Sequence, residues 1–466
     1  MHITRRFTFS CLALVVLAAL SGQAFAGTYY VANTPTGASG CAPHTYFPTI
    51  SAAIADIAVP AGSTIKVCPG TYPEQVAINK NVTLEGVTNT AEDAVVIVPP
   101  AGGVLTNAYD ICPALYSAYC TNGAPIAAQI LVTVSPVTIS NLTVDGTGNN
   151  LPAGCTPDLM GILFQNVTTG TVDHVAVRNQ VAGGVVNGCQ TGKGIYVETS
   201  TGASAVTVEN SSVHNYSKNG ITGRYPGTTI TVTGNYVQGS GVQNPPGDAQ
   251  NGIEIAFGAT GTVKTNTVID NVWYCPYTGA DGAGCTNVSS AADILLFDAD
   301  SSSSIEVETN ILGNAQNPIG LDTDEGYGSN EYGNGVTVSG NKIFGTGYYD
   351  AIDVCTNDNT VTGNTVFNSA ESAVHLDSSC SANGNNTGNS NTVSGNTIVE
   401  SACAGILEDS VTTNTLGTEA YYTVPFPFLN SSAAFPPSAC PNIPAFGGAV
   451  TREHGNKAEA KVRPAP

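Results

Sequence analysis

Segments in which β-branched residues alternate with polar ones recur through most of this chain. Alternation with a period of two is the pattern of a half-buried β-strand. Its return at irregular intervals of a few tens of residues is typical of a solenoid, in which every coil keeps its strands and has a loop of its own length. The clearest copies are 139–144, 206–210, 230–235, 336–341, 361–366 and 393–398.

A second strand pattern follows the first one within each coil. Its copies are 161–164, 194–197, 220–223, 252–255, 293–296, 319–322, 351–354, 373–376 and 405–408. Stacking these strands in parallel places the Ile and Val columns inside and the intervening residues outside. The first outward column is Leu163, Tyr196, Thr222, Glu254, Leu295, Gly320, Asp353, His375 and Leu407. The neighbouring column, two residues further on, is Arg224, Ala256, Phe297, Asp322, Cys355, Asp377 and Asp409.

An asparagine ends the first strand of most coils. Asparagine tolerates a left-handed backbone in turns, and its side-chain amide can bond the amide of the coil above. We therefore expect a structural stack of asparagines at the coil turns. Its members are Asn141, Asn210, Asn235, Asn266, Asn310, Asn341, Asn364 and Asn396.

The N-terminal region departs from this repeat. Residues 28–31 and 63–67 have the pattern of strands, whereas 47–54 has the apolar spacing of a short amphipathic helix with Pro48 near its start. A cap is expected there, because the open end of a coil stack exposes apolar side chains and unpaired backbone. The predicted fold class is all-β: a single-stranded parallel β-helix with a short N-terminal capping helix.

The opening coil carries a resemblance. The segment TIKVCPGTYPE at 64–74, followed by VTLEG at 82–86, resembles the N-terminal coil of the pectin-lyase-like superfamily. This resemblance implies a right-handed parallel β-helix. It matches no specific enzyme family: the Arg-Pro-Trp segment of pectinesterases is missing, since the only tryptophan is Trp273, and the Asp-Asp and Gly-His-Gly motifs of polygalacturonases do not occur. Pectate lyases need a catalytic arginine or lysine, and the outward columns offer Arg224 alone.

The two ends of the chain differ from the repeat. Residues 1–26 have the charged start, apolar stretch and small-residue cleavage site of a secretory signal. The β-helix domain is predicted over 27–420, with an irregular, proline-rich cap over 421–450 and a polar, disordered tail over 451–466. We therefore expect a secreted or periplasmic protein.

The cysteine count agrees with export. The chain has 13 cysteines, and one of them, Cys11, lies in the signal, so an even number remains for disulfides. Neighbouring pairs in the sequence suggest one connectivity among several. The near pairs are Cys41–Cys68, Cys112–Cys120, Cys275–Cys285 and Cys355–Cys380, and the cysteines that remain would pair as Cys155–Cys189 and Cys403–Cys440.

Charge narrows the class of partner. The chain has 14 Lys and Arg against 35 Asp and Glu, a net charge of −21, so nucleic acid and anionic membranes are not expected partners. A neutral polysaccharide is compatible with this charge, and a polyanionic one would need calcium or a local basic cluster. The length suits one elongated solenoid better than two compact domains. We expect a monomer.

Candidate catalytic residues gather in the outward columns. Asp353 and His375 would be neighbours on adjacent coils, about 4.8 Å apart, with Asp322 and Asp377 on diagonals of about 8 Å between backbones. That spread overlaps the roughly 6.5–9.5 Å between the carboxyl groups of inverting glycosidases. A histidine beside them could tune a pKa or bind a sugar hydroxyl. The alternative is a set of solvated acids on an acidic surface.

Further residues suggest substrate and metal contacts. Glu254 and Arg224 lie in the same columns, and Tyr348 and Tyr349 lie in a loop beside them, where aromatic faces could stack on sugar rings. The Asp-x-Asp-x-Gly spacing of Asp322 and Asp324 suits a hard cation such as calcium, although it is only half of a calcium-loop motif.

Two functions stay open at this point. In the first, the protein binds extracellular polysaccharide along the second-strand face and cleaves it as a glycosidase or lyase. In the second, it is a non-catalytic surface, adhesion or structural module, whose loops bind and whose coils are scaffold. A groove joining Asp322, Asp353 and His375 would favour the first, and a flat face with scattered charges the second.

Overall fold

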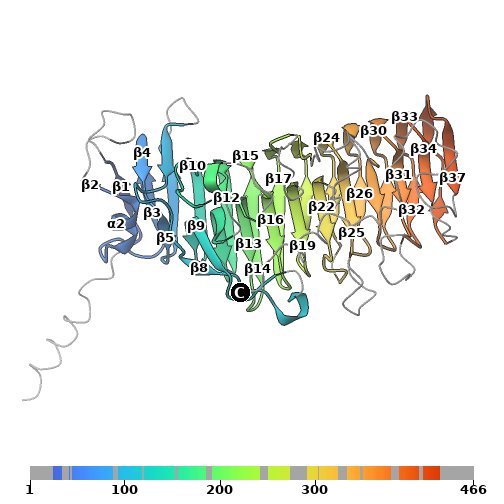
Figure 1. The fold of residues 1–466 in the computed structure, drawn as a ribbon. Helices are drawn as coiled ribbons and strands as arrows, with labels where there is room; N and C mark the ends of the chain where they lie inside the picture. The colour runs from blue at the N-terminus through green and yellow to red at the C-terminus, as the bar shows by residue number, and fades with distance from the viewer. Residues whose placement is uncertain are drawn as a thin grey trace, which may run out of the picture.

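The computed structural model is an elongated stack of parallel coils (Figure 1). The residues it describes are 25–33, 41, 45–87, 93–117, 120–152, 156–184, 191–241, 250–272, 291–302, 304–323, 333–346, 350–378, 388–408 and 413–430. The signal expected over 1–26 and the tail expected over 451–466 fall almost wholly outside these residues.

A sheet of 13 strands runs along one side of the stack. It contains the second strand pattern of the repeat, and all its neighbours pair in parallel except β8, which is antiparallel to β9. Its strands are β5 (Val76–Ile78), β8 (Ala108–Tyr109), β9 (Pro125–Val132), β11 (Asp158–Gln165), β13 (Lys193–Glu198), β16 (Asn219–Arg224), β19 (Asn251–Ala256), β22 (Ala292–Phe297), β25 (Asn317–Asp322), β28 (Ile352–Val354), β31 (Ser372–Leu376), β34 (Ala404–Glu408) and β37 (Phe426–Asn430).

A sheet of 24 parallel strands forms the rest of the coil. Its N-terminal strands are β1 (Thr28–Val31), β2 (Tyr46–Phe47), β3 (Ser63–Val67), β4 (Gly70–Pro73), β6 (Val82–Gly86), β7 (Val95–Val98), β10 (Val137–Asp145) and β12 (Thr169–Gln180). The middle strands are β14 (Ser204–Glu209), β15 (Ser212–Tyr216), β17 (Thr228–Thr233), β18 (Tyr236–Gln238), β20 (Thr260–Lys264), β21 (Thr267–Ile269), β23 (Glu306–Glu308) and β24 (Ile311–Ala315). The C-terminal strands are β26 (Thr337–Ser339), β27 (Lys342–Thr346), β29 (Thr360–Thr362), β30 (Thr365–Ser369), β32 (Thr392–Ser394), β33 (Thr397–Ser401), β35 (Thr415–Leu416) and β36 (Ala420–Tyr422).

Helix α2 (Ile50–Ala55) covers the N-terminal end, as the sequence predicts, but it starts later than residue 47. Thr49 is its N-cap, and the Thr49 side chain accepts a hydrogen bond from the Ala52 amide at 3.0 Å. Ile50 and Ile54 are buried against the first coils. The other helical turns are η1 (Ala114–Tyr116) and η2 (Ala182–Gly184). Within the described residues, no helix is long and apolar enough to cross a membrane.

The register of the 13-stranded sheet confirms the predicted columns. Ile and Val side chains pair from coil to coil and form the buried core. The paired inward residues are Ile162, Ile195, Ile221, Ile253, Ile294, Ile319, Ile352, Val374 and Ile406. The predicted outward column pairs in the same unbroken order, from Leu163 to Leu407. Residues far apart in sequence are therefore neighbours on the outer face of this sheet.

The asparagine stack exists, but its register corrects two members. From Asn235 to Asn396, each side-chain Nδ2 donates to Oδ1 of the asparagine one coil further on, at 2.9–3.0 Å. The left-handed backbone lies one residue earlier, on a glycine or threonine with φ between 55° and 69°. Asn141 and Asn210 adopt that left-handed position themselves, with φ of 56° and 48°. They therefore lie outside the stack, and Ser211 takes the stacked position instead, donating its amide to Asn235 Oδ1.

The last coil extends beyond the boundary expected at residue 420. Strand β36 pairs with β33, and β37 pairs with β34, so regular pairing continues to Asn430. The aromatic residues of this segment fit strands because they pack on the preceding coil, where Phe426 contacts the small cluster that contains Leu407.

Two predicted disulfides are confirmed, Cys41–Cys68 and Cys112–Cys120. Cys355 and Cys403 are also disulfide-bonded. The predicted pairs Cys155–Cys189 and Cys275–Cys285 lie outside the described residues, as do Cys380 and Cys440.

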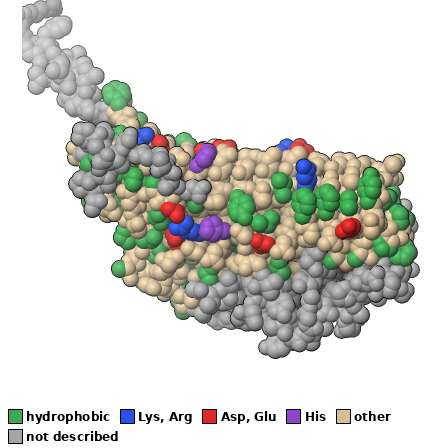
Figure 2. Space-filling view, turned by 90° about the horizontal axis from the view of Figure 1, so that it is seen from above, with side chains coloured by type: hydrophobic (Ala, Val, Ile, Leu, Met, Phe, Trp, Pro, Cys, Tyr) green, Lys and Arg blue, Asp and Glu red, His purple; other side chains and the backbone are tan. Residues whose placement is uncertain are grey.

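A row of hydrophobic side chains follows the upper face of the stack (Figure 2). On the strands β18 to β36 the large exposed hydrophobic residues are Tyr236, Ile311, Phe344 and Tyr422. The rings of Phe344 and Phe367, paired across β27 and β30, stack with centroids 5.0 Å apart and planes 2° apart. This ring pair packs side chain on side chain between two coils and stabilises the stack from outside.

Candidate active site

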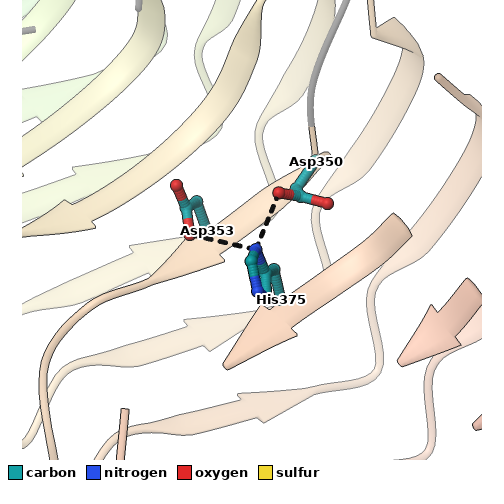
Figure 3. Close-up of side chains that lie close together, drawn as sticks. All are labelled: Asp350, Asp353 and His375. Carbon is teal, nitrogen blue, oxygen red and sulfur yellow. Dashed lines mark hydrogen bonds and ion pairs between the residues drawn. The ribbon is translucent and has the colours of Figure 1, made fainter. Parts of the chain in front are cut away.

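Three side chains that the sequence spreads over 26 positions meet on the outer face of the 13-stranded sheet: Asp350, Asp353 and His375 (Figure 3). Asp353 lies in β28 and His375 in β31, where the two residues are direct register partners, as predicted. Asp350 precedes β28. All three are at most 2% exposed. With Asp377 they are called the distal cluster below.

Asp350 orients the imidazole. His375 Nδ1 lies 3.0 Å from Asp350 Oδ2 and 3.9 Å from Asp353 Oδ1. The other oxygen of Asp350 accepts the Ser372 amide at 3.1 Å and the Ser372 hydroxyl. A carboxylate fixed in this way sets the tautomer and the ring orientation of the histidine. His375 is therefore held in one position beside Asp353.

Asp353 has its own support from the preceding coil. The Asn317 side-chain amide donates to Asp353 Oδ2 at 3.3 Å. One oxygen of Asp353 and one of Asp377 lie within 4.8 Å of each other. These two oxygens are thus closer together than the backbone diagonal of about 8 Å.

Asp322 lies one coil earlier. Its position in β25 is two residues beyond Gly320, which pairs with Asp353, so Asp322 is the diagonal neighbour that the sequence predicts. It is 4% exposed, and its Oδ1 accepts the Thr323 amide at 2.8 Å. Asp324, its predicted partner in calcium binding, lies outside the described residues.

Two groups of side chains have the spacing of metal ligands. In the first, Asp350, Asp353 and His375 offer two carboxylates and an imidazole within 4.8 Å. This set fits calcium poorly, because calcium takes six to eight oxygen ligands, and imidazole suits transition metals. In the second, Asp353 and Asp377 flank Cys355, whose sulfur is in a disulfide and is no thiolate ligand. Calcium binding by Asp322 and Asp324 stays a prediction.

The predicted substrate contacts Arg224 and Glu254 lie elsewhere on the same face. Arg224 Nη2 is 3.3 Å from Glu254 Oε1, and both side chains are at most 3% exposed. The Asn219 side chain also donates to Glu254. The guanidinium carbon lies 4.5 Å from the centroid of the Phe257 ring. These two residues bind each other rather than facing solvent.

A second buried ion pair adjoins them on β13. The Lys193 ammonium pairs with Asp158 and lies 5.2 Å from the centroid of the Tyr196 ring. Beside it, Glu198 Oε1 accepts a hydrogen bond of 2.7 Å from Gln165. Together, Asp158, Lys193, Tyr196, Glu198, Asn219, Thr222, Arg224, Asn251 and Glu254 are called the proximal cluster below.

Burial shifts the titration of this cluster. It raises the pKa of the Glu198 carboxyl to about 8, and the charge of Asp110 adds to the effect. The hydrogen bond from Gln165 and the charges of Lys193 and Arg224 oppose it. Glu198 therefore keeps its proton near neutral pH.

Apolar residues separate the two clusters. Strand β22 carries Leu295 and Phe297 on its outer face, and in the next coil Gly320 leaves the outward column without a side chain. From β16 to β28 there are four coil steps, about 19 Å. The polar side chains of this face are therefore gathered in two places and are not scattered evenly.

Several members of the two clusters are not among the sequence-based candidates: Asp350, Asp158, Lys193, Glu198, Asn219 and Asn251. Lys193 and Asp350 each lie two residues before an inward isoleucine, as do Asn219, Asn251 and Asn317. A polar residue that recurs two positions before the inward isoleucine is the sequence pattern that could have identified these residues. Tyr348 and Tyr349 lie outside the described residues.

Comparison with known proteins finds relatives by structure alone. No family profile matches the chain, and no curated protein matches its sequence. A GH136 lacto-N-biosidase from Eubacterium ramulus aligns with a TM-score of 0.52 at 13% identity, covering 85% of this chain and 68% of that one. Pectate lyase Pel9A aligns at 14% identity over 85% and 79% of the two chains, with a TM-score of 0.37.

A surface adhesin, PfbA of Streptococcus pneumoniae, aligns at 12% identity over 75% of this chain and 84% of that one, with a TM-score of 0.36. These identities are informative about the fold and not about activity. The resemblance of the opening coil to the pectin-lyase-like superfamily is thereby confirmed at the level of architecture: the chain is a right-handed parallel β-helix.

Proposed function

We propose that this protein is exported, binds a polysaccharide along the outer face of the 13-stranded sheet, and cleaves it at the distal cluster. Export is supported by the disulfides, which persist in oxidising compartments. The observation that carries the cleavage proposal is the buried imidazole between Asp350 and Asp353, with Asp377 close by.

The carboxyl geometry favours one stereochemical outcome. One oxygen of Asp353 and one of Asp377 lie within 4.8 Å of each other, which fits the close carboxyl pair of retaining glycosidases, roughly 5–5.5 Å, better than the roughly 6.5–9.5 Å of inverting ones. Asp353, fixed by Asn317, is the proposed nucleophile, which bonds the anomeric carbon as the glycosidic bond breaks. Asp377 donates its proton to the leaving oxygen, then removes one from the water that releases the sugar.

His375 is a positioning residue in this scheme. Its hydrogen bond to Asp350 fixes the ring, and the ring in turn limits the orientations of the Asp353 carboxylate. Replacing His375 would therefore lower turnover through misplacement of Asp353, since small displacements of a reacting group cost rate.

The test is a panel of neutral and acidic polysaccharides, with mass spectrometry of the products, in the presence of calcium and of a chelator. We expect new reducing ends from at least one glycan, and a loss of about 10³-fold or more for Asp353→Asn and Asp377→Asn. Proton NMR of the first product should show retained anomeric configuration. Inversion, or unchanged turnover in Asp353→Asn, would rule out the assigned roles.

One observation favours the alternative of a non-catalytic adhesion or structural module. The side chains of the distal cluster are almost fully buried, and buried polar networks also specify folds. In that case the panel yields no product, binding to a glycan survives Asp353→Asn, and Asp353→Asn lowers stability.

A further inference from the structure

We propose that the proximal cluster is a second ligand site, which binds a neutral, hydroxyl-rich ligand, an oligosaccharide, through Thr222, Asn251 and Glu198. The inference rests on the proposed function only for the class of ligand. The site itself is separate: its nearest strand, β19, is three coil steps from β28 and lies beyond the apolar coil β22.

Three fully buried oxygen atoms carry the proposal. Thr222 Oγ1, Asn251 Oδ1 and Glu198 Oε2 have no hydrogen-bond partner in the described part of the chain, and all three side chains are 0% exposed. Leaving a buried polar group unsatisfied costs about 1–3 kcal/mol. Such groups are rare in native proteins, and several together indicate a function or a bound molecule.

The sheet register places these oxygens across three adjacent strands. Thr222 in β16 lies between Tyr196 and Glu254 in the outward column. Glu198 in β13 pairs with Arg224, two residues from Thr222, and Asn251 in β19 pairs with Asn219, three residues from Thr222. Glu198 and Asn251 are therefore two strands and five register positions apart, about 16 Å along the strands. An extended ligand, an oligosaccharide lying obliquely across the strands, is needed to reach all three residues.

The atom types select hydroxyl groups as partners. An amide oxygen only accepts hydrogen bonds, whereas a threonine hydroxyl and a protonated carboxyl both donate and accept. Sugar hydroxyls match this set because they also do both. The neighbouring Tyr196 adds an aromatic ring, whose second face is suited to the apolar side of a sugar.

The charge balance argues against an anionic ligand. The two cations of the cluster are matched, Lys193 by Asp158 and Arg224 by Glu254. The protonated Glu198 contributes no positive charge. A carboxylated or phosphorylated ligand would therefore enter a buried site without a compensating cation, at a large desolvation cost.

Thr222→Val tests the site with little change of shape. Without ligand, the substitution removes an unsatisfied buried hydroxyl, so the melting temperature should stay the same or rise. With ligand, the affinity should fall about tenfold, the loss of one hydrogen bond worth about 1.4 kcal/mol. The probes are glucose, galactose, xylose and their oligomers as neutral sugars, and oligogalacturonate as the anionic one, measured by calorimetry and thermal melting on the full chain.

Thr228→Val is the matched control. Thr228 is equally buried and lies in the next strand along the chain, but its hydroxyl donates to the Arg224 carbonyl at 2.6 Å. Its substitution should lower the melting temperature and leave the affinity of the folded protein within about twofold of wild type. Asp353→Asn should leave sugar binding at the proximal cluster unchanged while abolishing cleavage.

A pH series provides a second readout. The groups facing Glu198 are Lys193, Tyr196, Arg224 and Asp110, in addition to Gln165. As pH rises through about 8 the carboxyl loses the proton it would donate, so affinity should fall in the wild type. Glu198→Gln, which keeps a donor at all pH values, should bind with little change over the same range.

The outcomes separate this proposal from the function above. Binding of a neutral sugar that weakens in Thr222→Val and survives Asp353→Asn supports a second site, even where no cleavage is found. The proposal is overturned by equal affinity in Thr222→Val and wild type, by tighter binding of oligogalacturonate, or by no binding of any neutral probe, in which case ordered water satisfies these oxygens. Loss of binding in Asp353→Asn would also overturn it.

Discussion

Carboxyl groups of this protein titrate according to the donors around them and not according to burial alone. Burial raises the pKa of Asp145, yet hydrogen bonds from Asn179, Thr147 and Arg178 outweigh it and lower the pKa to about 2. Among the residues that the structure describes, Glu198 has only Gln165 as a direct donor, and its pKa rises to about 8. At the scale of single residues, the balance between burial and the donors around the carboxyl decides the direction of the pKa shift: fully buried Asp293 has donors in Asn271 and Gly313, and its pKa is still raised.

Replacing Glu198 with Gln should therefore remove a pH-dependent loss of stability. The ordinary pKa of 4.5 describes the unfolded chain, and the folded pKa is about 8. Between these values the folded state holds one more proton than the unfolded state, so the free energy of unfolding falls by up to about 1.4 kcal/mol per pH unit as pH rises. Denaturant unfolding of wild type and Glu198→Gln across this window measures the difference.

The half-exposed Glu85 supplies the control for that experiment. Its salt bridge with Lys66 lies at the surface, where pairs contribute about 0–1 kcal/mol. The free energy of unfolding of Glu85→Gln should therefore change with pH as that of wild type does. The free energy of unfolding of Glu198→Gln should rise relative to that of wild type as pH rises. Parallel curves for all three proteins would contradict the assignment of a retained proton to Glu198.

At the scale of elements, the asparagine stack is the clearest stabilising device. Asn310 occupies its middle: Nδ2 donates to the Val263 carbonyl and to Asn341 Oδ1, each at 2.9 Å. Its Oδ1 accepts both the amide and the side chain of Asn266. Each asparagine thus satisfies groups on three coils, which fixes the register of the stack.

Asn310→Ala should consequently be among the most damaging polar substitutions in the chain. The substitution removes the hydrogen bonds that the Asn310 side chain makes to a buried carbonyl, a buried amide and two side chains. Each group left without a partner costs about 1–3 kcal/mol. We expect a loss of at least about 3 kcal/mol in denaturant unfolding. Asn210→Ala, outside the stack and exposed, is the matched control and should cost about 1 kcal/mol, because alanine is strained at its positive φ. Equal effects at both positions would refute the role of the stack.

Much of this architecture follows from the sequence because strand periodicity is strict. A shift of the register by one residue would turn the column of core side chains outward. The alternation of Ile and Val therefore determines which residues meet between coils, and these include Asp353 and His375. The turns carry no such constraint. The position of Asp350 before β28, and the one-residue offset of Asn210, depend on backbone conformations that several residue types can adopt.

The pairing of charged residues within the proximal cluster does not follow from the sequence, for a different reason. Arg224 and Glu254 were expected to face a substrate, but the structure pairs them with each other. Whether a charged side chain on a strand finds a neighbour or solvent depends on what covers the face, and strand periodicity contains no information on that cover. The sequence therefore predicts which residues lie on this face but not which of them pair with each other.

At the scale of the whole molecule, the coils form a one-dimensional stack in which each coil contacts mainly its neighbours. The free energy of unfolding of such a molecule is approximately the sum of the stability of each coil and of the interfaces between neighbouring coils. The two end coils need caps. The N-terminal cap depends on Glu74. Its carboxylate accepts the amides of Ile50 and Ser51 at 2.8 and 2.9 Å, and the Ser51 hydroxyl at 2.7 Å. It therefore binds the first turn of α2 to the coil below.

Glu74→Ala should open one end of the stack and leave the other intact. The substitution removes three charge-assisted hydrogen bonds at a helix N-terminus, a loss of about 2–4 kcal/mol for the local structure. Hydrogen exchange should accelerate in α2, β1 and β3 while β28 and β31 keep their protection, because coils far from the cap share no interface with it. Uniform acceleration from β1 to β34 would instead mean that the stack unfolds as one cooperative unit, and the nearest-neighbour description would fail.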